Sequence, residues 1–65
     1  MDNYLIRILK SGPIHYNLLY ELVLYKLTFL YNVDERLTYL LQQGIIKEKN
    51  GYWWHKDVNP SNLFR

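Results

Sequence analysis

The stretch YLLQQGIIKEKNGYWWHK, residues 39–56, contains the strongest local structural signals in this chain. Up to Gln43 it continues an amphipathic helical pattern, and Gly44 is typical of the position that follows a helix. Two β-prone segments then flank Asn50-Gly51, and Asn-Gly between such segments is the strongest short hairpin signal that a sequence offers. The stretch therefore predicts the end of a helix followed by a β-hairpin.

The predicted hairpin carries aromatic residues on both faces. A two-residue turn at residues 50–51 sets Lys49 opposite Tyr52 and Lys47 opposite Trp54, and strand alternation puts Trp53 on the other face. One face can cover the core with a large aromatic area, while the other carries lysines and aromatic surface. Two interpretations stay open for the outer face: an aromatic lid with lysine stems packed on it, or a basic surface that contacts phosphates.

Three helical segments precede the hairpin. Residues 3–10 carry apolar side chains at helical spacing, after Asp2 as a cap and before the breaking pair Gly12-Pro13. Residues 15–27 are helical by length and leucine content, and residues 29–43 follow Thr28 as a possible cap. The alternative is that Thr28 lies inside one long bent helix. The inward stripes are expected to contain Leu5, Ile8 and Leu9 in the first helix, and Phe29, Val33, Leu37, Leu40 and Leu41 in the third. Ile14 is too isolated to form a strand alone but can pair with a later one.

The middle helix, residues 15–27, is apolar around most of its circumference. At about 100° per residue, the face expected to pack on the core consists of Leu18, Leu19, Leu22 and Tyr25. A second apolar set lies off that face, and monomers seldom leave such a patch in water. We therefore expect a homodimer, or permanent docking on another protein, through Tyr16, Tyr20, Leu24 and Leu27. The alternative is that a long helix buries Leu24 and Leu27 under the next helix of the same chain.

Length and composition define the class of protein. Of the 65 residues, 22 are Leu, Ile, Val or Phe, which is too apolar for a disordered chain and enough for one small core. There is no cysteine, and the net charge is +2, which is compatible with a nucleic-acid partner. No apolar run reaches the length of a membrane span, and MDNYLIRILK lacks the order of a signal peptide. We expect a cytoplasmic protein with no membrane partner.

The sequence offers little to catalysis. Asp34 and Glu35 are adjacent, so on a helix their carboxylates point about 100° apart and do not form a working pair. His15 and His55 have no metal ligands at useful spacing, and each is expected to be a surface or boundary residue. No glycine-rich phosphate loop or recognisable nucleophile motif is present. We expect no enzyme activity, no metal, no cofactor and no small-molecule substrate.

The order of predicted elements is helix, short strand, helix, helix, hairpin, in a mainly α domain over residues 1–56 with a C-terminal tail at 57–65. This order resembles the winged-helix family of helix-turn-helix domains. The resemblance rests on LKSGPIHYNLL (9–19), on VDERLTYLLQQGII (33–46) with its spacing of Val33, Leu37, Leu40 and Gly44, and on IIKEKNGYWW (45–54) as the wing. It departs at LVLYKLTFLYNV (22–33), which has no glycine and is about one helical turn too long, so we expect an extended second helix or a reshaped turn.

The resemblance implies that the third helix reads the major groove of DNA and that the wing contacts phosphates. The outward face of this helix is expected to show Tyr31, Asn32, Glu35, Arg36, Thr38, Tyr39, Gln42 and Gln43. The expected DNA-binding residues are Asn32, Arg36, Tyr39, Gln43, Lys47, Lys49, His55 and Lys56. A plain solvated face, or a protein contact, is the alternative for this helix.

Two functions follow as expectations. The first is a transcriptional regulator that binds duplex DNA as a homodimer, similar in composition to small regulators of archaea or their viruses. The second is a winged-helix interaction module, a small subunit of a replication, transcription or repair complex that docks through the apolar second helix.

Overall fold

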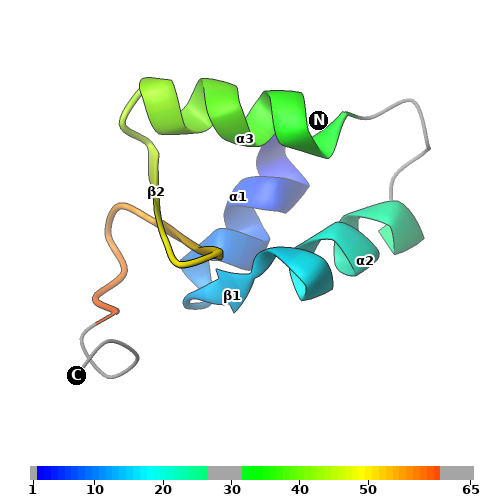
Figure 1. Ribbon diagram of the computed structural model, residues 1–65, viewed down its shortest axis with the longest axis horizontal. Coiled ribbons are helices and arrows are strands. Elements are labelled where there is room, and N and C mark those ends of the chain that lie inside the picture. Colours follow the sequence, from blue (N-terminus) through cyan, green and yellow to red (C-terminus); the bar gives the residue numbers. More distant parts are fainter. Residues whose placement is uncertain (1, 27–31, 61–65) are drawn as a thin grey trace.

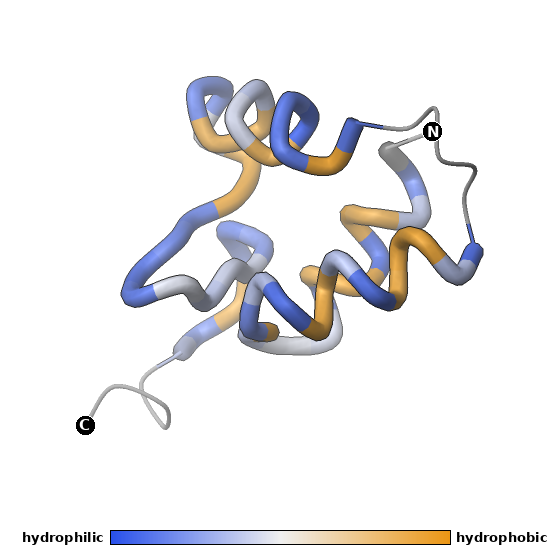
Figure 2. The backbone as a smooth tube through the Cα atoms, turned by 45° about the vertical axis from the view of Figure 1, so that its right-hand side comes forward, coloured by the Kyte–Doolittle hydropathy of each residue, from blue (hydrophilic) through white to orange (hydrophobic). Residues whose placement is uncertain are grey.

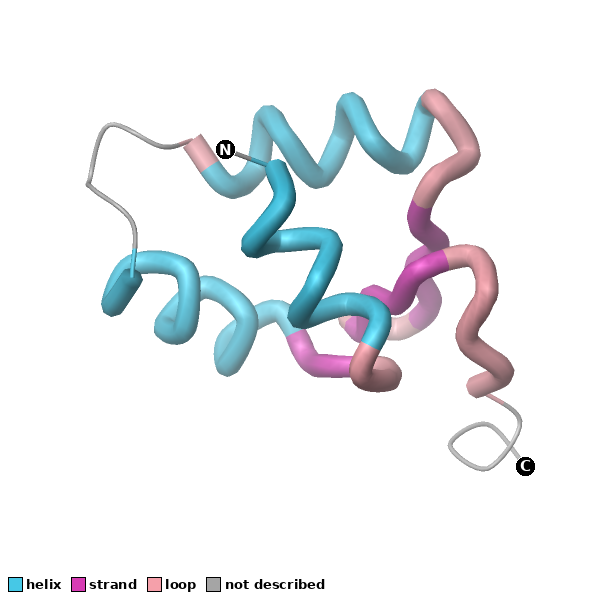
Figure 3. Tube along the Cα trace, turned by 180° about the vertical axis from the view of Figure 1, so that it is seen from behind, coloured by secondary structure: helices cyan, strands magenta, loops and turns pink. Residues whose placement is uncertain are grey.

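The computed structural model of the chain describes residues 2–26 and 32–60. Its elements are α1 (Asp2–Lys10), β1 (Ile14–His15), α2 (Tyr16–Lys26), α3 (Val33–Gln42), β2 (Ile46–Lys49) and β3 (Tyr52–His55). The described residues form a small, mainly helical domain with an antiparallel sheet in the order β1-β3-β2. α1 lies between α2 and α3, and the sheet lies at one end of the helices (Figures 1 and 3).

The hairpin forms as the sequence predicts. Asn50 and Gly51 both have positive φ, +54° and +86°, which is the requirement of the type I′ turn that joins two strands directly. The register pairs Lys49 with Tyr52 and Lys47 with Trp54, as expected. Glu48 steadies the turn, because its Oε2 accepts a hydrogen bond from the Gly51 N–H at 2.9 Å. A Cβ at position 51 would lie 3.0 Å from Nε2 of His15, so this glycine also allows β1 to approach the turn.

The isolated residue Ile14 pairs with Trp53 of β3, which confirms that it joins a later strand. A second contact fixes the start of α2 against the hairpin, since the Tyr16 N–H donates to the Gly51 carbonyl at 2.8 Å. The β2–β3 hairpin is thereby tied to the segment between α1 and α2.

The core draws on all three helices and on β2. Its buried cluster consists of Leu5, Leu9, Leu19, Val23, Val33, Leu37, Leu40 and Ile46. Ile8 and Trp53 are half-buried and pack against it. The hydrophobic residues of α1 and α3 recur at the spacing that turns one side of each helix inward (Figure 2). The stripe predicted for the third helix is confirmed at Val33, Leu37 and Leu40, whereas Leu41 is exposed and Phe29 lies outside the described residues.

The third helix begins later than predicted. α3 starts at Val33, and its N-cap is Asn32, whose backbone is extended and whose side chain accepts a hydrogen bond from the Glu35 N–H at 3.0 Å. The prediction of a helix from residue 29 capped by Thr28 is therefore wrong at its cap. α3 ends at Gln42, and Gly44, which was expected to follow the helix, has a φ of +76°. The Gly44 N–H donates to Leu41 and the Ile45 N–H to Leu40, which is the Schellman pattern.

The predicted core face of the second helix is wrong. Only Leu19 of that set is buried, and Val23 is its partner one turn on. Leu18, Leu22 and Tyr25 are 51%, 36% and 89% exposed. α2 spans Tyr16–Lys26. Leu27 and the connection to α3 fall on residues 27–31, outside the described part. The prediction of an extended helix or a reshaped turn falls on this connection. In residues 2–26 and 32–60, no helix has the length and apolar character needed to cross a membrane.

Candidate functional site

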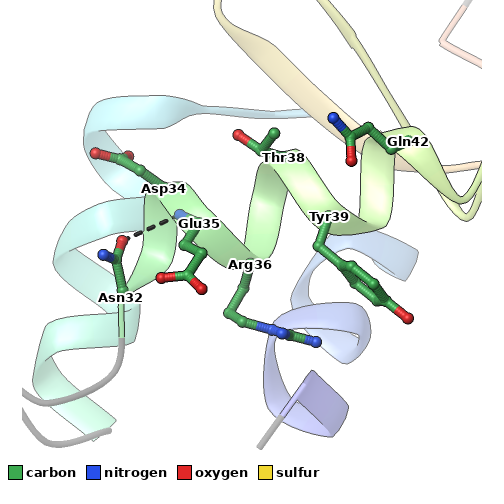
Figure 4. A pocket seen from close by; sticks show the side chains of 7 residues that line it. All are labelled: Asn32, Asp34, Glu35, Arg36, Thr38, Tyr39 and Gln42. Atoms are coloured by element: carbon green, nitrogen blue, oxygen red, sulfur yellow. Dashed lines mark hydrogen bonds between the residues drawn. The ribbon is translucent and has the colours of Figure 1, made fainter.

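A shallow depression lies on the surface of α3 that faces away from the core. Its lining comes entirely from this helix and its cap (Figure 4). The lining residues are Asn32, Asp34, Glu35, Arg36, Thr38, Tyr39 and Gln42. All but two of the residues predicted for the outward face of this helix therefore lie together. Of those two, Tyr31 is outside the described residues and Gln43 is exposed but does not line the depression.

The order of side chains around α3 follows from its inward stripe. With Val33, Leu37 and Leu40 buried, a helical repeat of about 100° places Glu35 and Gln42 farthest from the core. Arg36 and Tyr39 extend to one side of the helix, and Asp34 and Thr38 extend to the other (Figure 4). The outermost line is thus polar and runs the length of the helix.

Acidic side chains occupy the first turn of α3. Asp34 and Glu35 follow the Asn32 cap directly, where the positive end of the helix dipole stabilises carboxylates. Their position is explained by helix stability, and they would repel a phosphate brought near this end. A polyanion that lies along α3 must therefore place its phosphates elsewhere.

The cation of the depression is held against an aromatic ring. The Arg36 guanidinium lies over Tyr39, 4.6 Å from the ring centroid. Such a contact is worth about 0.5–1 kcal/mol at exposed sites and limits the rotamers that the arginine samples. Arg36 and Tyr39 are thus brought together as one unit on the flank of α3.

A hydrogen bond joins α2 to α3 at the edge of the depression. The Tyr16 hydroxyl donates to Oδ1 of Asp34, and the Tyr20 ring lies against Tyr16 with centroids 5.9 Å apart. The bond to the carboxylate, followed by burial and the charge of Asp34, raises the pKa of Tyr16 to about 12. Tyr16 was expected to contact a partner chain, but its hydroxyl is engaged within the domain.

Replacing Tyr16 by phenylalanine is expected to lower the free energy of unfolding by about 1 kcal/mol at neutral pH. The folded chain holds this proton more tightly than the unfolded chain, whose tyrosine pKa is near 10.0. The stabilisation is therefore complete below pH 10 and is lost as the pH rises towards 12. The free energy of unfolding, measured with urea across this pH range, should decline less for Tyr16→Phe than for the parent. Tyr20→Phe is the control, and an equal effect of both changes would contradict this role.

The outer face of the hairpin carries the predicted lysines. Ile46 and Trp53 turn towards the core, so alternation directs Lys47, Lys49 and Tyr52 to the opposite face. Both lysines are exposed. His15 extends this face across β1, since it pairs with Tyr52 and the two rings meet edge to face at 5.1 Å. The hairpin therefore presents two cations beside an aromatic pair.

Some aromatic residues of the hairpin are packed away from solvent and others are partly exposed. Trp54 is only 6% exposed although it shares the face of the lysines, and Trp53 is half-buried against the core. Tyr52 is half-buried. The tryptophans beside this turn are therefore largely withdrawn from water.

His55, one of the residues predicted to contact DNA, is buried. Its side chain is 6% exposed, because its position opposite Ile46 directs it to the core side of the sheet. Its Nδ1 accepts a hydrogen bond from the Asp57 N–H at 3.1 Å. The expectation that His55 is a surface or boundary residue is therefore wrong. Its predicted contact with DNA stays a prediction, and the burial of the side chain speaks against it. Lys56, by contrast, is exposed, and its N–H ties the end of β3 to the Ile45 carbonyl at 3.0 Å.

The described part of the tail continues from this contact. The Val58 N–H donates to the His55 carbonyl at 2.9 Å, and Val58 and Pro60 are half-buried. Residues 57–60 thus begin with a turn closed by hydrogen bonds to His55.

Two other predicted DNA contacts have structural tasks. Asn32 caps α3 through its side-chain oxygen, and Gln43 is the C-cap residue, whose N–H donates to the Tyr39 carbonyl at 3.0 Å. Gln42, one residue earlier, is exposed and lines the depression. The two glutamines are therefore both exposed, and they differ in that Gln42 lines the depression and Gln43 does not. A helical wheel drawn with Leu37 and Leu40 facing the core separates the position of Gln42 from that of Gln43.

Three of the residues predicted for a partner interface lie on one side of α2, and they differ in how far they are available to a partner. Tyr20 and Leu24 are 41% and 42% exposed on α2, Tyr16 is engaged with Asp34, and Leu27 lies outside the described residues.

Among the described residues, no three His, Asp or Glu side chains gather as a metal site. Comparison of the chain with protein-family models, curated proteins and solved structures finds no match.

Proposed function

We propose that this chain is a winged-helix domain that binds duplex DNA, with α3 in the major groove and the β2–β3 hairpin as the wing beside it. The observation that carries the proposal is the exposed polar line of α3 together with the exposed cations of the neighbouring hairpin. The order of elements supports it, since the chain runs helix, strand, helix, helix, hairpin. In such domains a helix reads base edges and flanking basic residues hold the backbone.

The chemistry of α3 suits base edges better than phosphates. Gln42 can form a bidentate pair with adenine, Glu35 can accept from the amino group of cytosine, and Thr38 can contact a thymine methyl group. The acidic first turn keeps phosphates away from that end of the helix. Lys47, Lys49 and Lys56 would then contact the phosphates. Arg36, on the flank of α3, can reach either base edges or phosphates. A domain that reads sequence in this way acts by occupying its site, and we propose transcriptional regulation as its role.

The test is a change of base preference at α3. Gln42→Ala is expected to weaken discrimination at one base position by about 1–3 kcal/mol while leaving the other positions unchanged. Selection from a randomised duplex library, followed by fluorescence anisotropy on the selected sites, measures this. Gln43→Ala is the matched control, because Gln43 is the adjacent residue of the same type and does not line the depression. Equal loss from both variants, or a uniform loss over all sequences, would contradict base reading by Gln42.

A second candidate function is a protein-interaction module, a small subunit of a larger assembly that docks through α2. The specific observation in its favour is the set of exposed apolar side chains on that helix. The two functions differ in duplex affinity: an interaction module has no need to bind DNA even at low salt.

A further inference from the structure

α2 presents an apolar stripe to solvent along its whole length. Leu19 and Val23 face the core, while Leu18, Leu22 and Tyr25 are 51%, 36% and 89% exposed. Their spacing of four and then three residues places them on one side of a helix. Hydrophobic residues recur along the middle of α2, interrupted by hydrophilic ones (Figure 2). This stripe is the set Leu18, Leu22 and Tyr25, and it differs from the set that the sequence suggested for a partner.

Two charges of opposite sign flank the stripe. α2 has the sequence YNLLYELVLYK, in which Glu21 and Lys26 are the charged residues. At 3.6 residues per turn, Glu21 lies about 70° to one side of the stripe and Lys26 about 70° to the other. Leu18, Leu22 and Tyr25 thus take the apolar seam positions of a coiled coil, and Glu21 and Lys26 take the two flanking positions that pair between helices.

The arrangement of these charges identifies the occupant. When two copies of α2 lie side by side and parallel, the left flank of one helix meets the right flank of the other. Glu21 of each copy then faces Lys26 of the other, five residues further along, which is the pairing that specifies parallel coiled coils. In an antiparallel pair, by contrast, Glu21 would face the second Glu21. We propose that the stripe is the interface between two copies of this chain, with their α2 helices parallel about a two-fold axis.

The opposite flank of α2 does not offer the same complementarity. Tyr20 and Leu24 are exposed there, but Tyr16 completes the row and its hydroxyl is bound to Asp34 of the same chain. A two-fold pair built on the stripe leaves that flank and the outer line of α3 uncovered. Each protomer then keeps its α3 surface available, and the interface does not depend on whether that surface binds DNA.

Sedimentation equilibrium of the full chain, without nucleic acid, tests the proposal. The expected result is a mass twice 8.0 kDa at micromolar concentration. Leu22→Glu is expected to raise the dimer dissociation constant about 100-fold or more, because it places two carboxylates in the apolar seam. Leu24→Glu is the matched control on the same helix, with similar exposure and off the stripe, and it should leave the dimer intact.

A charge exchange tests the parallel orientation with side chains that the fold does not bury. Glu21→Lys alone should weaken the dimer about fivefold, and combining it with Lys26→Glu should restore the parent value. A monomer at the highest concentration, or equal losses from Leu22→Glu and Leu24→Glu, would overturn the interface. Failure of the double exchange to restore association would overturn the parallel arrangement.

Discussion

Replacing Leu37 by alanine is expected to lower the free energy of unfolding by about 2–5 kcal/mol. Leu37 is 1% exposed at the centre of the inward stripe of α3, between Val33 and Leu40. The lost methyl groups leave a cavity that the surrounding side chains fill only in part. A domain of this size obtains roughly 3–5 kcal/mol from its whole core, so the variant is expected to be largely unfolded at room temperature.

Urea unfolding followed by circular dichroism measures this loss, and the chain supplies its own control. Leu41→Ala removes the same atoms from the same helix, but Leu41 is 40% exposed. Its loss should stay within about 1 kcal/mol. Similar losses at the two positions would show that the inward face of α3 is not the one described.

The double replacement Lys47→Ala with Lys49→Ala is expected to lower duplex affinity by about 50-fold at roughly 0.1 M salt. Each phosphate contact releases counterions, so the logarithmic salt slope should fall by about 0.9 for each lysine. The loss should be the same for every duplex sequence, because phosphates carry no base identity. Fluorescence anisotropy over a range of salt concentrations gives both the affinity and the slope.

A control of equal charge separates contact from net charge. Arg7 and Lys10 are exposed on α1, and replacing both by alanine changes the net charge by the same amount. That variant should keep the parent slope and lose little affinity. If the two double variants behave alike, the hairpin lysines attract DNA only through the overall charge of the chain.

The features that follow from sequence are those with a local cause. Asn50-Gly51 fixes the turn type, the turn fixes the register, and the register places Lys47 and Lys49 on one face. The inward stripe of α3 was likewise predictable, since apolar and polar residues alternate there with a helical period. The exposure of Gln42 follows from that stripe once Leu41 is known to lie outside it.

The features that the sequence does not predict depend on tertiary contacts, or lie in segments whose apolar and polar residues do not separate into distinct faces. α2 is apolar nearly all round, so its pattern cannot distinguish Leu19 and Val23 from Leu18 and Leu22 as the core face. Thr28 and Asn32 are both good caps, and only the folded chain shows that Asn32 caps α3. The Tyr16–Asp34 bond joins residues 18 positions apart, for which neither helix carries a local signal.

The most direct test of the central claim is a salt titration of the parent chain on a random-sequence duplex. Phosphate contacts from Lys47, Lys49 and Lys56 predict a logarithmic slope of about −2.7, with further steepening if Arg36 also contacts the backbone. Fluorescence anisotropy from about 20 to 200 mM salt covers the range in which such a slope is measurable. A slope near this value is the predicted result. No binding at the lowest salt concentration would contradict DNA binding by α3 and the wing.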